Sequence, residues 1–213
     1  MKDPLGRLFP NLPHGVRVVL DWVITIVGAV VIVFLIKWYV VNPYRIPSSS
    51  MEPTLHCARP GPGCEARFSD RVLANRLIYH FRDPRRREIV VFTTPPLAKV
   101  RCGQGGTYVK RVIGLPGEVW AETQGKISID GKPLSEPYIK FDRRDFETHT
   151  MKDIPGPDGK TGVYTKIPKG MYLMMGDNRS SSCDSRKWGL VPRHNIIGEV
   201  FMTYWPPNRI SFH

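Results

Sequence analysis

Residues 108–114 read Tyr-Val-Lys-Arg-Val-Ile-Gly, and their alternation is typical of a β-strand. Because successive side chains of a strand point to opposite faces, Lys110 shares a face with Tyr108 and Val112, and Arg111 faces the other way. With this one, runs rich in β-branched and aromatic residues predict strands at 71–79, 88–93, 107–114, 118–121, 171–175 and 197–204. Residues 127–134 read as a hairpin across an Asp-Gly turn. This pattern predicts a mainly β fold.

The composition agrees with a globular β domain. The chain has 213 residues, 41% of them hydrophobic, so it can bury a sizeable core. Its 20 prolines and 19 glycines favour short strands and turns, and no convincing amphipathic helix follows residue 41. Two stretches rich in turn-forming and charged residues, 57–67 and 142–162, are expected to be surface excursions.

One long apolar segment precedes the β region. Residues 22–36 carry no charge, and the apolar stretch continues past Lys37 to Val41. As a helix, residues 16–41 would be about 39 Å long at ~1.5 Å per residue, enough to cross a hydrocarbon core of ~30 Å. The alternatives are a cleaved signal peptide or a buried helix, but no small-x-small cleavage site follows the segment. We expect a cytoplasmic segment at 1–17, a transmembrane anchor at 18–41 and a β domain at 42–213.

The chain is strongly basic, with a formal net charge of +12. Residues 42–213 carry 27 basic and 17 acidic side chains, so this part alone has a charge of +10. No zinc-finger spacing, RNA-binding aromatic signature or dense lysine tract occurs, so we expect no nucleic-acid partner and interpret the charge as suited to a lipid surface. Three basic residues flank the apolar segment on each side, so the charge balance does not set its orientation.

The four cysteines divide into two kinds. Cys57 and Cys64 flank Ala-Arg-Pro-Gly-Pro-Gly, which would turn the chain back on itself, so the sequence allows a disulfide between them without deciding it; such a bond would indicate an oxidising compartment. Cys102 and Cys183 have no such local signal, and we expect them to be free. No Cys-x-x-Cys or Cys/His spacing typical of a metal site occurs, so neither a metal nor a cofactor is expected.

Three serines, Ser48, Ser49 and Ser50, lie between two prolines shortly after the apolar segment. Most turn serines do no chemistry. A nucleophilic serine among these three would need a base that accepts its proton. No Gly-x-Ser-x-Gly elbow or Ser-x-x-Lys motif occurs, and nothing points to a Ser-His-Asp triad. Lys110 is a candidate, because apolar neighbours would lower its pKa from ~10.4 by the roughly three units that a base near neutral pH needs. The alternative is an ordinary half-buried lysine whose ammonium reaches solvent.

Three blocks of sequence carry a family resemblance. Residues 46–55 (IPSSSMEPTL), 108–118 (YVKRVIGLPGE) and 172–191 (YLMMGDNRSSSCDSRKWGLV) resemble, in this order, the type I signal peptidases, also called leader peptidases. The blocks cover 41 residues, and the preceding apolar segment extends the likeness over most of the chain. The resemblance implies an antiparallel-sheet catalytic domain behind one N-terminal transmembrane helix.

The resemblance also implies a Ser–Lys dyad. Ser50 would attack the scissile carbonyl, and neutral Lys110 would accept its proton and then protonate the leaving amine. Ser48 matches the position whose hydroxyl joins the Ser50 backbone N–H in an oxyanion hole. Ser49 falls at a variable position and is interpreted as a spacer with an exposed hydroxyl.

Four residues of the third block match positions that support such a site. Ser182 aligns with the serine that orients the lysine, Asp184 and Arg186 match a supporting pair, and Gly176 would shape the turn. Candidate walls of the small substrate pockets are apolar residues near the two proposed catalytic groups, with plain core packing as the alternative: Ile46, Met51, Leu55, Tyr108 and Val109.

By resemblance, the substrate is the signal peptide of an exported preprotein, cut after small residues. The expected location is the plasma membrane, with a single span and the catalytic domain on the extracytoplasmic side. Other readings are a self-cleaving repressor-type protein, a pilus-maturation peptidase of the same clan and, outside enzymes, a basic membrane-tethered binding domain. The sequence leaves the oligomeric state open.

Overall fold

The computed structural model describes residues 13–103, 105–146, 154–155 and 163–213. It divides into two compact units, Met1–Val41 and Asn42–His213. In the first unit, α2 (His14–Tyr39) contains the apolar segment Gly15–Leu35, whose 21 residues would rise about 32 Å at ~1.5 Å per residue. None of this segment is buried, so by length and composition it is a candidate membrane span.

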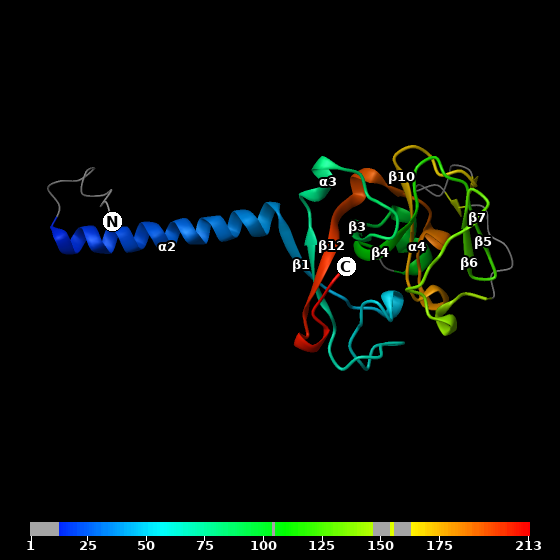
Figure 1. Ribbon diagram of the computed structural model, residues 1–213, viewed down its shortest axis with the longest axis horizontal. Coiled ribbons are helices and arrows are strands. Elements are labelled where there is room, and N and C mark those ends of the chain that lie inside the picture. Colours follow the sequence, from blue (N-terminus) through cyan, green and yellow to red (C-terminus); the bar gives the residue numbers. More distant parts are fainter. Residues whose placement is uncertain (1–12, 104, 147–153, 156–162) are drawn as a thin grey trace. The chain divides into compact units, whose positions relative to one another are not determined.

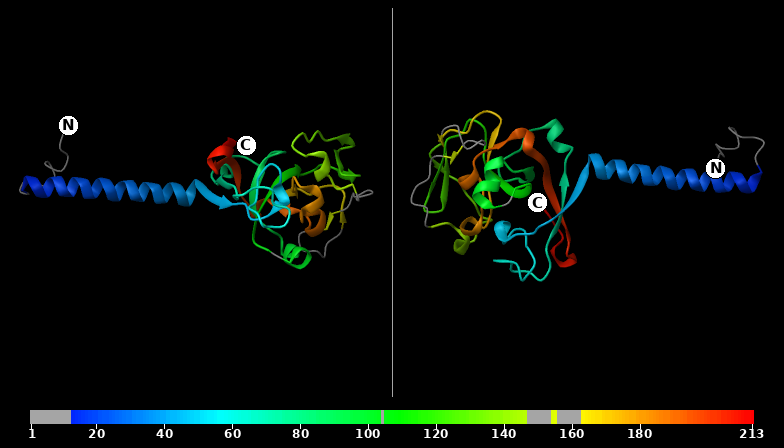
Figure 2. Two further views of the ribbon diagram at one scale, coloured as in Figure 1. Left: turned by 90° about the horizontal axis from the view of Figure 1, so that it is seen from below. Right: turned by 180° about the vertical axis from the view of Figure 1, so that it is seen from behind.

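The second unit is built on antiparallel sheets (Figures 1 and 2). Its largest sheet has eight strands, seven of them in the order β1-β2-β12-β3-β4-β10-β11, and β13 pairs with β12. These strands are β1 (Val41–Arg45), β2 (Arg71–Asn75), β3 (Ile89–Thr93), β4 (Thr107–Gly114), β10 (Met171–Met175), β11 (Val191–Pro192), β12 (Ile196–Trp205) and β13 (Ser211–Phe212). The predicted mainly β, antiparallel architecture is therefore confirmed.

Smaller elements complete the described part of the unit. A three-stranded sheet contains β5 (Trp120–Thr123), β6 (Lys126–Ile129) and β7 (Lys132–Pro133), and a two-stranded sheet contains β8 (Ile154–Pro155) and β9 (Val163–Tyr164). Asp130 and Gly131 both have positive φ, as the turn between β6 and β7 requires, so the predicted hairpin is confirmed. The helices are α3 (Ile78–Phe81), α4 (Pro96–Cys102) and α5 (Ser185–Trp188).

The central strands of the large sheet are buried on both faces. In β3, Val90 and Phe92 belong to one core cluster, and Ile89 and Val91 belong to another. Tyr108 and Val112 of β4 pack in or against the cluster that holds Val90 and Phe92, and Val109 packs against the opposite cluster. The intervening Lys110, paired with Val90, thus has the predicted strand parity and lies within a core layer.

Two expectations for secondary structure were wrong. The strand predicted over 71–79 ends at Asn75, because the Asn75 side chain accepts hydrogen bonds from the N–H groups of Leu77 and Ile78 and turns the chain into α3. The helix α4 was not expected; Pro96 begins it, and Gly103, with a φ of 72°, ends it.

The second excursion, 142–162, falls largely outside the described residues. The first one is described. A disulfide joins Cys57 and Cys64, which the sequence allowed but left open, and Ala58 bridges to Ala66 within the stretch.

The expectation that Cys102 and Cys183 are free was also wrong, because they form a second disulfide with a Cα–Cα distance of 6.1 Å. These cysteines are 81 residues apart, so only the folded arrangement of α4 and the segment before α5 brings them together.

Candidate active site

A cleft of about 550 Å³ opens on the large sheet, beside the serine turn. One wall is the segment from Tyr44 to Met51, and another is the first half of β4, from Thr107 to Lys110. The Cys102–Cys183 disulfide and Ser181 complete the lining, together with Gly105. Lys110 is 60 residues or more from Ser48 and Ser50 in the sequence. All three residues nevertheless line one cavity.

The three serines lead into a single turn of 3₁₀ helix, Ser49–Met51, with Ser48 at its N-cap in an extended conformation. Met51 anchors the turn, because its side chain is buried in the cluster with Ile46 and Leu55. The hydroxyl oxygens of Ser48 and Ser50 lie 3.3 Å apart at the cleft, close enough for a hydrogen bond. The turn thus presents two hydroxyls together while its hydrophobic residue holds it to the core.

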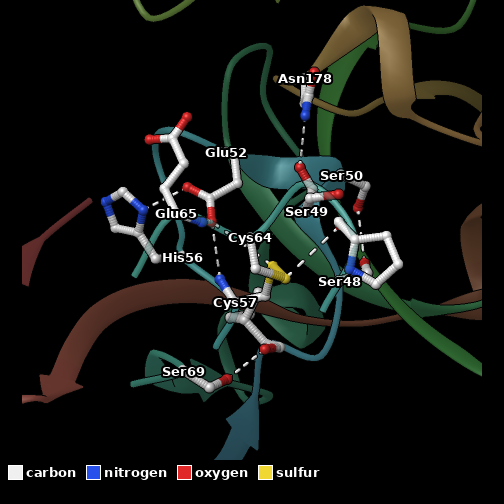
Figure 3. Close-up of a disulfide and its surroundings, with 12 residues drawn as sticks. Ser48, Ser49, Ser50, Glu52, His56, Cys57, Cys64, Glu65, Ser69 and Asn178 are labelled. Carbon is white, nitrogen blue, oxygen red and sulfur yellow. Dashed lines mark hydrogen bonds and ion pairs between the residues drawn. A yellow bond between two sulfur atoms is a disulfide. The ribbon is translucent and has the colours of Figure 1, made fainter. Parts of the chain in front are cut away.

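Asn178 fixes this turn from the loop after β10. Its backbone N–H donates to the carbonyl oxygen of Ser50 at 3.1 Å, and its side-chain amide donates to the carbonyl oxygen of Ser49 at 3.0 Å (Figure 3). The sequence gave no sign of the contact between Asn178 and the serines. The contact spans more than 120 residues, so no local pattern could have shown it.

Lys110 is 2% exposed, although it lines the cleft. Burial lowers its pKa to about 8, and this effect exceeds the opposing attraction of Asp184 and Asp177. Among the described residues, Lys110 takes part in no ion pair, and its Nζ lies 5.8 Å from the centre of the Tyr108 ring. A lysine in this environment is partly neutral near neutral pH.

Gly176 brings the loop after β10 against the serine turn. A Cβ at this position would overlap the carbonyl oxygen of Ser50 and the hydroxyl of Ser182, and it would lie 2.7 Å from the Ser182 Cβ. Only the absence of a side chain at Gly176 therefore lets Ser182 approach the turn that carries Ser50. The Ser182 hydroxyl is buried and makes no hydrogen bond within the described part of the chain.

Two buried carboxylates hold this loop in place. Asp184 accepts two hydrogen bonds from the Arg186 guanidinium and one, at 3.1 Å, from the Gly176 N–H. Burial alone would raise the pKa of Asp184, but Arg186 and these donors keep it below its usual value. Asp177 binds the Arg111 guanidinium through both oxygens and accepts from the Thr54 hydroxyl at 2.5 Å.

The structure brings most of the predicted site residues together. Ile46, Met51, Tyr108 and Val109 line the cleft with the proposed dyad. Leu55 is fully buried in the core and is not among the cleft-lining residues. The Cys102–Cys183 disulfide lines the cleft and was missed, because the two cysteines were expected to be free.

The sequence of residues 19–205 matches the family model described as signal peptidase, peptidase S26. The chain belongs to this signal peptidase family. Signal peptidase I of Leptolyngbya laminosa is 37% identical over 211 residues, which cover 99% of this chain and 91% of that protein. Signal peptidase IB of Staphylococcus aureus (strain MRSA252) is 34% identical over 200 residues, which cover 91% and 93% of the two chains.

A crystal structure of a signal peptidase I from Enterococcus faecalis V583 is 29% identical to this signal peptidase and covers 56% of its chain and 97% of the solved one, with a TM-score of 0.43. The family membership therefore rests on sequence. This signal peptidase removes signal peptides, so its substrates are preproteins that carry them. Its N-terminal apolar helix is suited to membrane anchoring.

Proposed function

We propose that Ser50 is the nucleophile and Lys110 the general base of the peptide cleavage. The observation that supports this assignment most strongly is the burial of Lys110, which lowers its pKa to about 8 within the cleft that also exposes the Ser50 hydroxyl. A serine hydroxyl is a poor nucleophile and a charged lysine is a poor base. One apolar site addresses both difficulties, since it favours neutral lysine and strengthens the hydrogen bonds to developing charge.

In the first half of the reaction, Ser50 Oγ forms a bond to the scissile carbonyl carbon while its proton passes to neutral Lys110. The carbon–nitrogen bond then breaks, and the Lys110 ammonium returns this proton to the leaving amine. In the second half, a water molecule loses a proton to Lys110 and attacks the ester on Ser50. Lys110 protonates Ser50 Oγ as the signal peptide leaves, so both groups return to their starting states.

The oxyanion of each tetrahedral intermediate would bind between the Ser48 hydroxyl and the Ser50 backbone N–H. The 3.3 Å separation of the two hydroxyl oxygens supports this role, because it places the Ser48 donor beside the attacking atom. A single oxyanion donor contributes about 3–4 kcal/mol to transition-state stabilisation in enzymes of this kind. Ser182, held close to the Ser50 carbonyl by Gly176, would orient Lys110, and the Asp184–Arg186 pair would hold the loop that carries Ser182.

The substrate would bind as an extended strand along the first half of β4. The strand β10 pairs with β4 at Arg111, Val112 and Gly114, whereas Thr107–Lys110 runs along the cleft wall. Ile46, Met51 and Val109 are apolar residues of the cleft lining, which suits small apolar residues before the scissile bond. Tyr108 lies on the same wall.

The dyad is tested by cleavage of a purified preprotein by the full-length protein in detergent. We expect Ser50→Ala and Lys110→Met each to lower the rate by at least ~10⁴-fold, with unchanged circular dichroism. Lys99→Met, on the exposed side of α4, is the matched control and should keep the wild-type rate. Full activity in either folded dyad variant would overturn the assignment.

We further propose that α2 spans the plasma membrane once and that residues 42–213 work on the extracytoplasmic side. Two disulfides support this orientation, since disulfides persist in oxidising compartments. Lys132 in β7 is exposed, so a membrane-impermeant amine reagent should label it on intact cells. Labelling of Lys132 only after cell lysis would place the domain on the cytoplasmic side.

A further inference from the structure

We propose that Glu52 is a positioning residue for the nucleophile: its buried carboxylate holds the disulfide-closed segment Cys57–Cys64 against the back of the serine turn. This inference rests on the proposed role of Ser50, and it adds a residue outside the dyad and its supporting loop. Glu52 lies two positions after Ser50, yet it is 0% exposed. A buried carboxylate is costly unless it is paired and hydrogen-bonded, so its partners define what it does.

Those partners belong to the disulfide-closed segment and its borders. Glu52 Oε1 accepts hydrogen bonds from the backbone N–H groups of Cys57 at 3.1 Å and Glu65 at 3.4 Å. The other oxygen, Oε2, lies against Nδ1 of His56, a contact that is an ion pair when the imidazole is protonated. Figure 3 shows the Glu52 carboxylate between His56 and the disulfide, on the side of the turn away from Asn178. One side chain therefore fixes three points of this segment and its borders.

The segment touches the serine turn directly. A Cβ at Gly63, whose φ of 70° suits glycine, would lie 2.8 Å from the Ser49 hydroxyl. Ser49 is thus half-buried against the disulfide-closed segment. Because Glu52 also donates its own N–H to the Ser49 carbonyl at 3.0 Å, the turn and the segment meet at Ser49 and Glu52. Asn178 holds the turn on one side and the Glu52 assembly supports it on the other.

The ligand atoms of Glu52, His56 and Glu65 lie within 4.8 Å of one another, as in some metal sites. However, the Glu65 carboxylate forms an ion pair with Arg143, and the Glu52 carboxylate already has two N–H donors and His56. The positive charge of Arg143 beside the cluster disfavours a bound metal ion. We therefore interpret the cluster as a clamp made of ion pairs and hydrogen bonds.

Two substitutions of Glu52 distinguish the length of its side chain from its negative charge. Glu52→Gln keeps an oxygen that can accept from Cys57 and Glu65, whereas Glu52→Asp keeps the charge but shortens the side chain by one methylene. In preprotein cleavage by the full-length protein in detergent, we expect Glu52→Gln to keep kcat within about threefold. Glu52→Asp and Glu52→Ala should lower kcat by about tenfold or more, because a shift of ~1 Å in a reacting group costs up to 10²-fold. KM should change little, since the other wall of the cleft, the first half of β4, stays in place.

Asp70 provides the matched control. It is a buried carboxylate that accepts the His56 N–H at 2.7 Å and pairs with Arg209, so it holds the same segment at its base without reaching the serine turn. Asp70→Ala should lower the Tm, measured by circular dichroism, without lowering kcat at a temperature where the protein is folded.

The outcomes distinguish a positioning role from a merely structural one. Glu52→Asp with a reduced kcat, an unchanged pH midpoint and a rescuing Glu52→Gln supports the proposal. Wild-type kcat in Glu52→Asp, or a loss in Glu52→Gln as large as in Glu52→Asp, overturns it, and neither result needs Glu52→Ala to fold. Activity of Ser50→Ala would instead overturn the proposed dyad itself, so failure of the two proposals is told apart in one assay.

Discussion

The backbone N–H of Asn178 donates a hydrogen bond to the carbonyl oxygen of Ser50 at 3.1 Å. The loop after β10 therefore holds the serine turn directly, and the same loop continues to Ser182 and to Asp184, whose charge acts on Lys110. The position of Ser50 and the protonation of Lys110 thus both depend on one short segment. Each consequence of this arrangement can be measured separately.

The side-chain hydrogen bond of Asn178 should matter for rate. Asn178→Ala removes the donor to the Ser49 carbonyl but keeps the backbone bond to Ser50, so the turn loosens without losing its fold. We expect kcat to fall by about tenfold, as measured with a purified preprotein. Asn195→Ala is the matched control, since Asn195 makes an exposed side-chain bond to the Thr93 carbonyl and should leave kcat unchanged. Equal rates for the two variants would contradict the role of Asn178.

Gly176→Ala tests the close approach of Ser182 to the turn. The new Cβ would overlap the Ser50 carbonyl and the Ser182 hydroxyl, so we expect kcat to fall by ~10²-fold or more. Gly198→Ala is a control with a clash elsewhere, because its Cβ would lie 2.7 Å from the Asn75 carbonyl between β12 and β2. That variant should lose stability in thermal unfolding but keep the kcat of its folded fraction. A wild-type kcat in Gly176→Ala would show that cleavage does not depend on the close approach of Ser182 to the serine turn.

The pH dependence of cleavage should report Lys110. A base must be neutral, and with a pKa of about 8 only about a tenth of Lys110 is neutral at pH 7, against about nine-tenths at pH 9. We therefore expect kcat/KM to rise with pH, with a midpoint near 8. A profile that is flat between pH 7 and 9, or a midpoint near 6.5 typical of histidine, would contradict Lys110 as the base.

Replacement of Lys110 should stabilise the fold at neutral pH. Burial lowers its pKa from 10.5 to about 8, which corresponds to roughly 3 kcal/mol at 1.36 kcal/mol per unit. Below about pH 8 the folded protein carries the buried charge and the whole penalty. Between about 8 and 10.5 only the unfolded chain is still protonated, so wild-type stability rises with pH.

We therefore expect Lys110→Met to raise the free energy of unfolding by about 1–3 kcal/mol at pH 7, since the penalty inferred from the pKa already includes the attraction of Asp184. The gain should shrink towards pH 10. Urea unfolding of both proteins at pH 7 and pH 10 provides the comparison. A variant that is less stable than the wild type at both values would show that the lysine charge is well accommodated.

Much of this site could be predicted because its information is local. Strand alternation placed Lys110 on the face of Tyr108 and Val112, and β4 has the predicted limits. The Asp130-Gly131 turn was likewise readable from two residues. The resemblance of three sequence blocks to one family also predicted that the serine turn, the strand that carries Lys110 and the loop after β10 form one site.

The parts that were missed depend on contacts between distant segments. The Cys102–Cys183 disulfide spans 81 residues, and the bond from Asn178 to Ser49 spans 129. The end of β2 was misplaced because the side chain of Asn75 accepts hydrogen bonds from backbone N–H groups that would otherwise be free to continue the strand pairing. The pattern of apolar residues, from which the strand was predicted, carries no information on such a bond. The burial of Glu52 was equally hidden, since its sequence position suggests an exposed turn residue.

The most direct measurement is the rate of preprotein cleavage by three single variants of the serine turn, each compared with the wild type at pH 9. We expect Ser50→Ala to be inactive, Ser48→Ala to be slower by about 10²–10³-fold, and Ser49→Ala to stay within about threefold. All three proteins should show wild-type circular dichroism. Cleavage by Ser50→Ala at a rate like that of Ser49→Ala would contradict the assignment of Ser50 as the nucleophile.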